Sequence, residues 1–225
     1  MGEHVTRNRE MTRSISGLHM AIRSESGVRV CLSLICLLYV GVVFCTAWLA
    51  EDAFITFRTV DNFINGYGLT WNIGERVQAY THPLWMFLVS ACYFATREIS
   101  LTTMFLSLAV SSTAVWIFVR NVAGSAWAAL GVLVIIASRA FIDYSTSGLE
   151  NPLTHLLLAL FVVLYLREKA QGNPLLLSLV VGLALINRMD LGLIFGPGLL
   201  WALWQRRSWP YLSRTIIGLA PLALW

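Results

Sequence analysis

Residues 30–50 read VCLSLICLLYVGVVFCTAWLA, and residues 51–83 continue directly as EDAFITFRTVDNFINGYGLTWNIGERVQAYTHP. The first stretch is apolar over 21 residues, enough for a helix to cross ~30 Å of hydrocarbon at ~1.5 Å per residue. The second is polar and opens with two adjacent carboxylates, Glu51 and Asp52. Because a charge held against hydrocarbon costs about 3 kcal/mol or more, acids at the mouth of a membrane helix bundle indicate function. We therefore predict that the polar stretch forms a reaction centre.

The composition is typical of a multi-pass membrane protein. Of the 225 residues, 57% are hydrophobic and only 12% are charged, whereas about a quarter of the residues in soluble domains are charged. The net charge of +4 is not gathered into a basic patch with interleaved aromatic residues, so we expect membrane lipids and no nucleic acid as partners. The four cysteines lack framework spacing and predict free thiols.

Further apolar runs predict further helices, at about residues 101–119, 123–138, 152–166, 174–187, 191–205 and 211–225. We therefore predict an all-α fold, a polytopic transmembrane helix bundle over residues 30–225 that follows a cytoplasmic tail at residues 1–29. The chain stops at Trp225 inside an apolar run, which indicates truncation at the carboxy terminus.

The run at residues 84–95 is apolar for only 12 residues, too short to span a bilayer, and we predict that it does not cross. The first outer loop then extends over about residues 51–100, and a helical apolar stripe at residues 52–64 predicts an interfacial helix within it. In this arrangement the cytoplasmic segments hold 11 of the 16 Lys and Arg residues, as the positive-inside rule requires. Eight of the 12 acidic residues gather on the outer side.

Three outward loops hold the candidate functional residues: Glu51, Asp52, Arg58, Glu75, Tyr80 and His82 in the first, Arg139 and Glu150 in the second, and Arg188 and Asp190 in the third. A carboxylate can take the proton of an attacking hydroxyl as a general base. Arginine guanidinium groups pair with phosphate oxygens and can stabilise a leaving phosphate. These residue types at one membrane face indicate group transfer from a lipid phosphate.

Short segments of the loops form a recognisable pattern: EDAFI at residues 51–55, NGYGL at 65–69, NIGERVQAYT at 72–81, PLW at 83–85, SGLENP at 147–152 and RMD at 188–190. This pattern resembles the GT-C membrane glycosyltransferases, in particular the arabinofuranosyltransferases of mycobacterial cell-wall assembly. The resemblance covers about residues 30–200. Glu51 stands where that group usually has Asp, and Met189 replaces the usual Pro.

The resemblance implies a polyprenyl-phosphate sugar donor, with arabinofuranose as the best guess, and a glycan or protein acceptor in the cell envelope. It implies a bacterial inner membrane protein with its active site on the periplasmic face. By position, Asp52 is the catalytic base with Glu51 beside it, Glu150 supports the acceptor or donor, and Arg188 lies near the donor phosphate. We expect no cofactor, although hard oxygen ligands at Glu51, Asp52 and Glu150 leave a divalent cation open.

The residues taken alone leave other interpretations open. Two acids after a transmembrane helix are often solvated ends, His82 before a proline can be a local hydrogen-bonding residue, and Arg139 can be an interface anchor. Arg188 and Asp190 can pair with each other. The alternative function is a non-enzymatic membrane protein, either a transporter of lipid-linked sugar or an inactive truncated remnant. Transporters place charges near the bilayer midplane, whereas these acids gather at helix ends, which favours the enzyme.

Overall fold

The structure, a computed structural model, describes residues 27, 30–75, 77, 80–122, 126–171 and 173–223. Every regular element in this part of the chain is a helix, which confirms the all-α prediction there. The expected cytoplasmic tail lies outside the described residues except for Gly27, and so does Trp225. The helices are Val30–Cys45, α2 (Ala53–Ile64), α3 (Pro83–Thr96), α4 (Ile99–Val122), α5 (Ala126–Ala137), α6 (Arg139–Asp143), α7 (Asn151–Gln171), α8 (Leu175–Asn187), the 3-10 helix η1 (Met189–Leu191), α9 (Gly192–Arg206), α10 (Trp209–Gly218) and α11 (Ala220–Ala223).

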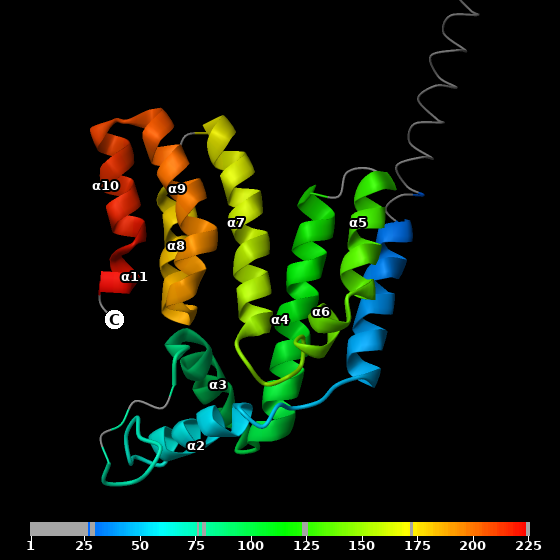
Figure 1. Ribbon diagram of the computed structural model, residues 1–225, viewed down its shortest axis with the longest axis vertical. Coiled ribbons are helices and arrows are strands. Elements are labelled where there is room, and N and C mark those ends of the chain that lie inside the picture. The colour runs from blue at the N-terminus through cyan, green and yellow to red at the C-terminus, as the bar shows by residue number, and fades with distance from the viewer. Residues whose placement is uncertain are drawn as a thin grey trace, which may run out of the picture.

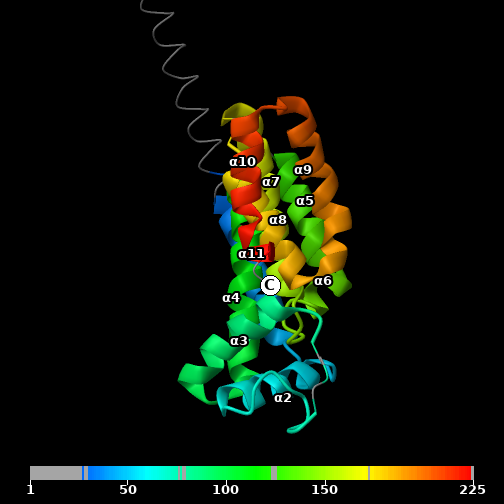
Figure 2. The same cartoon turned by 90° about the vertical axis from the view of Figure 1, so that its left-hand side faces the viewer.

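The longer helices run roughly parallel, from α10 at one edge to the Val30–Cys45 helix at the other (Figure 1). The same helices form a narrow slab when viewed at 90° (Figure 2). Helix α4 packs along α7, α7 packs on α8, and α8 packs on α10. One buried core lies around Trp85, Met86 and Phe195, and a second lies around Tyr39 and Val132. The two cores fix the relative positions of the helix ends.

The loops divide between the two ends of this bundle. The carboxy-terminal ends of α4 and α7 and the α9–α10 connection lie at one end, and the first loop, the α5–α7 connection and the α8–α9 junction lie at the other (Figure 1). This is the grouping that the distribution of basic and acidic residues predicts. All the candidate functional residues therefore belong to one end of the molecule.

The first apolar run forms a shorter helix than its length predicts, because the helix ends at Cys45. Residues 46–50 leave the helical path and bond to the second loop instead. The Trp48 indole donates to the Asp143 carbonyl at 2.9 Å, and the Ala50 amide donates to the Ser147 carbonyl at 2.8 Å. Tertiary hydrogen bonding thus overrides the apolar pattern over these five residues, and it ties the start of the first loop to the second loop.

The helix predicted within the first loop is present as α2, but its apolar residues do not share one environment. Phe57 and Val60 are buried, whereas Phe54, Ile55 and Phe63 are exposed. Helix α2 lies across the end of the bundle and packs on α3 (Figures 1 and 2). Only part of the apolar stripe is therefore needed to hold α2 in place.

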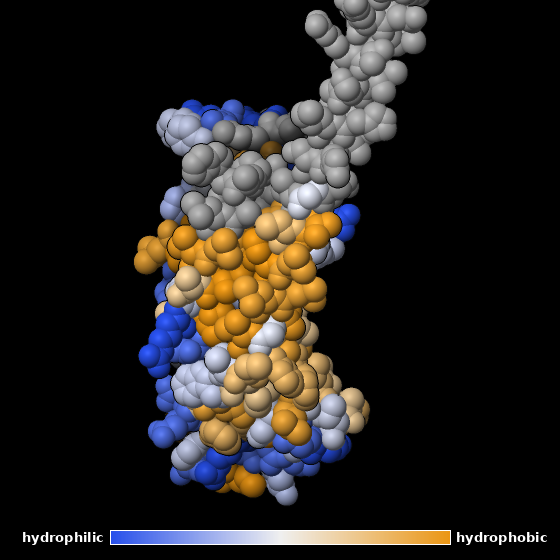
Figure 3. Space-filling model, turned by 90° about the vertical axis from the view of Figure 1, so that its right-hand side faces the viewer, coloured by the Kyte–Doolittle hydropathy of each residue, from blue (hydrophilic) through white to orange (hydrophobic). Residues whose placement is uncertain are grey.

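One helix in the described ranges, Ile99–Asn121, is both long and apolar enough to cross a membrane on its own. The Val30–Cys45, α3 and α8 helices are apolar but shorter. The face of the molecule seen in Figure 3 nevertheless carries a broad hydrophobic band between hydrophilic regions. Leu34, Leu37 and Phe44 of the Val30–Cys45 helix are each at least 60% exposed, and such large exposed apolar surfaces indicate contact with a membrane or another protein.

Candidate active site

Glu51 and Asp52 precede the first turn of α2, and both are exposed. Asp52 occupies the position before the helix, where an Asp side chain commonly accepts a hydrogen bond from a backbone amide of the first turn. Here the Asp52 backbone is already helical, with φ −62° and ψ −25°, and its side chain makes no capping bond. The Asp52 carboxylate is therefore open to solvent and to a ligand.

Gly148 brings the second loop against the first turn of α2. Its φ of +81° lies in the left-handed region that favours glycine, and an added Cβ would meet the Ala53 Cβ at 2.8 Å and Leu49 at 3.0 Å. The Gly148 carbonyl accepts a hydrogen bond from the buried Trp85 indole at 3.0 Å. Only a glycine allows this close approach, and it places Glu150 two residues further along at the same junction.

The Glu150 carboxylate is buried and engaged at both oxygens. The Arg188 Nη1 donates to Oε1 at 2.9 Å, and the His82 Nδ1 lies 3.3 Å from Oε2. Arg188 also binds Asp190 with two hydrogen bonds, from Nη2 at 2.7 Å and from Nε at 3.0 Å. One arginine therefore connects a buried carboxylate with an exposed one, and it keeps unused N–H groups for a further acceptor.

His82 is buried and links this group to α2. Its Nε2 lies 2.8 Å from the Thr56 hydroxyl, so donation from Thr56 to Nε2 and from Nδ1–H to Glu150 satisfies both ring nitrogens of a neutral imidazole. Burial lowers the pKa of His82, Glu150 opposes that shift and Arg188 adds to it. The resulting contacts run from α2 through His82 and Glu150 to Arg188.

The Arg188–Asp190 pair sits where the chain changes course between α8 and α9. Arg188 adopts extended backbone with φ −157° and ψ 128°, which ends α8, and η1 follows. The hydrogen bonds between the two side chains raise the pKa of Arg188 and lower the pKa of Asp190. Both groups are therefore charged at neutral pH.

The remaining predicted site residues do not join this group. Arg58 donates to Asn72 at 3.0 Å, and Asn72 donates to Glu75 at 3.0 Å, which forms a separate exposed cluster in the first loop. Tyr80 is buried in the core beside Trp85. The interpretation of Arg139 as a surface anchor fits the structure, because its side chain is 92% exposed and pairs with Asp143 four residues later.

The structure adds two residues that the sequence analysis missed. Thr56 lies one helical turn after Asp52, and this spacing could have placed its hydroxyl on the same side of α2. Asn187 is fully buried and donates to the Thr154 hydroxyl at 3.0 Å, which joins the end of α8 to the start of α7. No sequence pattern distinguishes Asn187 from an ordinary helix-terminal asparagine.

Across the described ranges no three His, Cys, Asp or Glu side chains converge as metal ligands would.

Two curated proteins named terminal β-(1→2)-arabinofuranosyltransferase are similar to this chain. The one from Mycobacterium tuberculosis is 31% identical over 193 residues, which cover 77% of this chain and 30% of the relative. The one from Corynebacterium glutamicum is 30% identical over 110 residues, 46% of this chain and 16% of the relative. This chain thus spans about a third or less of these relatives' length. No protein-family profile matches it, and no solved structure does.

Proposed function

We propose that this chain, a homologue of the terminal β-(1→2)-arabinofuranosyltransferases over most of its length, takes part in sugar transfer at a membrane. The donor is a polyprenyl-phosphate sugar, with arabinofuranose as the best guess, and the acceptor is a glycan or protein of the cell envelope. The observation that carries this proposal is the exposed Glu51–Asp52 pair, held by Gly148 against the loop that bears Glu150.

Asp52 acts as the general base in this proposal. Its carboxylate takes the proton of the acceptor hydroxyl while that oxygen attacks the anomeric carbon. The bond between the anomeric carbon and the phosphate oxygen breaks, and the polyprenyl phosphate leaves with the electron pair. Attack from the face opposite the phosphate inverts the anomeric centre. Glu51, exposed beside Asp52, orients the acceptor or supports the charge of the base.

Arg188 binds the donor phosphate in this proposal. Two of its five N–H groups remain after its bonds to Glu150 and Asp190, and a guanidinium pairs well with phosphate oxygens. Glu150 and Asp190 are positioning residues that hold the guanidinium, and His82 in turn positions Glu150. Arg58 and Glu75, in their separate cluster, suit contact with a larger acceptor, whereas burial of Tyr80 and the Asp143 partner of Arg139 favour structural roles.

The proposed location is a bacterial inner membrane, crossed several times, with the candidate site on the outer face. The division of the loops between two ends and the hydrophobic band between them support this (Figures 1 and 3). A membrane face also suits a donor whose lipid tail stays in the bilayer. A transporter would instead carry charges near the midplane of its helices, whereas the Glu51, Asp52 and Arg188 charges lie at one end.

Transfer of radiolabelled arabinose from synthetic polyprenyl phosphate arabinose tests the donor class. Membranes from cells that carry the chromosomal gene are compared with membranes from a deletion strain, and polyprenyl phosphate mannose serves as a second donor. We expect gene-dependent transfer from the arabinose donor. Gene-dependent transfer from the mannose donor alone would contradict the sugar assignment, and equal transfer in both strains would contradict the activity.

A further inference from the structure

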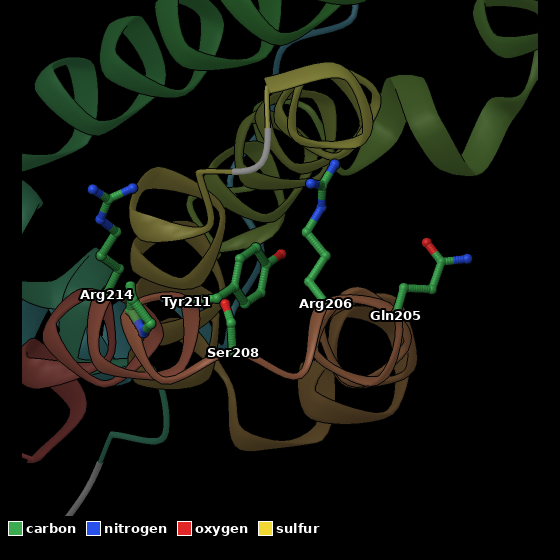
Figure 4. A pocket seen from close by; sticks show the side chains of 6 residues that line it. Gln205, Arg206, Ser208, Tyr211 and Arg214 are labelled. Atoms are coloured by element: carbon green, nitrogen blue, oxygen red, sulfur yellow. The ribbon is translucent and has the colours of Figure 1, made fainter.

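A polar pocket lies at the end of the bundle opposite the candidate active site. It has a volume of about 350 Å³ and is lined by residues of the α9–α10 turn and of α10: Gln205, Arg206, Ser208, Pro210, Tyr211 and Arg214. Arg206 and Arg214 project on either side of the Tyr211 ring (Figure 4). Two guanidinium groups from successive helices thus border one cavity, and neither belongs to the proposed transfer site.

The two arginines differ in how they are held. Arg206 Nε lies 3.2 Å from a buried Glu168 oxygen on α7, which fixes the guanidinium at the pocket wall and offsets its charge. Arg214 is exposed and forms no ion pair within the part of the chain that the structure describes. The pocket therefore carries one cation whose charge no carboxylate neutralises there.

The pocket lining also contains neutral hydrogen-bond donors, the hydroxyl groups of Tyr211 and Ser208. Tyr211 is only 4% exposed, and its hydroxyl lies beside Glu168 without a hydrogen bond of good geometry among the described residues. Ser208 precedes α10, and its side chain makes no capping bond. The first turn of α10 adds the partial positive charge of a helix amino terminus. Hydroxyl donors, a helix start and an uncompensated guanidinium together select an anion with several acceptor oxygens, such as a phosphate.

The surroundings of the pocket indicate where that phosphate comes from. Trp204 and Trp209 flank the turn and are 66% and 76% exposed, and Arg207 stacks on Trp204 at 3.7 Å. Exposed Leu200 and Trp201 continue the apolar surface along α9. Exposed tryptophans between an apolar surface and arginines are typical of the level of lipid headgroups.

We propose that this pocket binds the phosphate of an anionic phospholipid in the leaflet opposite the candidate active site. The phosphate diester lies in the pocket that Arg206, Tyr211 and Arg214 line, and the acyl chains extend along the exposed apolar face of α9. Basic pockets between membrane helices bind anionic headgroups in this way. The site is distinct from the transfer chemistry and does not depend on it.

Native mass spectrometry of the purified full chain tests this. The protein is titrated with phosphatidylglycerol and, separately, with phosphatidylcholine. We expect preferential retention of phosphatidylglycerol, and we expect Arg214→Gln to weaken it by about fivefold or more, since an arginine near an anionic lipid surface contributes on that order. Arg207→Gln is the matched control, because it removes the same charge from the same turn but does not line the pocket. Arg207→Gln should retain phosphatidylglycerol as the wild type does.

Equal losses in the two variants would overturn the proposal, because they would show diffuse attraction to the basic turn. Absence of any preference for phosphatidylglycerol in the wild type would also overturn it. The last part of the experiment adds inorganic phosphate as a competitor of the bound lipid. Displacement of the lipid by phosphate at matched concentration would assign the pocket to free phosphate, whereas retention of the lipid supports the headgroup. Tyr211→Phe, which keeps the packing, should weaken binding less than Arg214→Gln.

Discussion

Glu150 is the most constrained charge at the candidate site. Its carboxylate is buried, and its contacts with Arg188 and His82 offset the free-energy cost of removing that charge from water. A buried carboxylate that loses its cation keeps its desolvation cost, whereas a partly exposed arginine that loses one carboxylate can turn to water. The two partners of this ion pair should therefore respond differently to substitution.

We predict that Arg188→Gln lowers the free energy of unfolding by about 2–3 kcal/mol, because it leaves Glu150 buried without its cation. Glu150→Gln should cost about 1 kcal/mol, since Arg188 is 40% exposed and keeps Asp190. Denaturant titration in detergent micelles measures both. The double variant should cost less than the sum of the single variants, and additive losses would contradict direct coupling.

The His82 environment predicts a pH dependence. Its pKa is lowered in the folded chain, so the unfolded chain binds more protons below the ordinary value of about 6.5. The stability contributed by neutral His82 is therefore complete above about pH 6.5 and is lost as the pH falls towards the folded pKa. His82→Gln removes this titration and keeps hydrogen-bonding groups.

The stability difference between wild type and His82→Gln should therefore shrink as the pH falls from about 7.5 to about 5.5. Thermal unfolding in detergent measures it, and the comparison cancels the other titrating groups. A constant difference across this range would show that His82 is not buried as a neutral imidazole.

The residue types at this site could be predicted from sequence, but most of their contacts could not. The acids and Arg188 were identifiable because charges beside apolar runs are rare and costly. The Glu150–Arg188 pair spans 38 residues and His82–Glu150 spans 68, so no local spacing connects them. Nothing in the sequence around Thr56 and Asn187 indicates their hydrogen-bond partners, because these partners are brought close only by the packing of α2 and α8.

At the scale of elements, Gly148 determines how the second loop meets α2. The same fold offers a matched comparison at Gly74, whose φ is +90° but whose added Cβ would meet nothing within 4 Å. A substitution at Gly74 therefore introduces backbone strain alone, and one at Gly148 introduces strain together with overlap.

We expect Gly74→Ala to cost about 1 kcal/mol, the usual penalty of a left-handed alanine. Gly148→Ala should cost about 2–4 kcal/mol, because the loop must also move away from Ala53 and Leu49. Under the proposed function, this displacement also lowers sugar transfer in Gly148→Ala but not in Gly74→Ala. Equal unfolding free energies in the two variants would contradict the close packing at Gly148.

Helix boundaries show where local patterns fail. The helical period correctly predicts α2, whereas the run at residues 84–95, predicted only as a segment too short to cross a bilayer, forms helix α3. The first apolar run does not remain helical to Ala50, because Trp48 and Ala50 bond to the second loop. Hydrophobicity alone could not indicate that competition, since residues 46–50, TAWLA, continue the apolar run without a charged residue.

At the scale of the whole molecule, the charge distribution correctly predicts which loops lie together, because the chain reverses direction from one long bundle helix to the next (Figure 1). Whether the two ends face opposite sides of a membrane is a separate proposal. It can be tested with cysteines at one exposed position on each end, Glu75 and Arg207, in a variant without the four native cysteines.

We predict that Glu75→Cys reacts with a membrane-impermeant maleimide in intact spheroplasts. Arg207→Cys should react only after lysis, because the positive-inside rule places the basic turn in the cytoplasm. Labelling of both positions before lysis would contradict the proposed topology, and labelling of Arg207→Cys alone would reverse it.

The measurement that tests the central proposal most directly is arabinose transfer from polyprenyl phosphate arabinose by Asp52→Asn at equal protein level. We predict a loss of about 100-fold or more, the usual contribution of a general base. Asp61→Asn is the control, because it removes a carboxylate from α2, the helix that Asp52 precedes, and keeps an oxygen to accept the 2.6 Å hydrogen bond from Tyr93. It should retain transfer. Wild-type transfer by Asp52→Asn would contradict the assignment of Asp52 as the base.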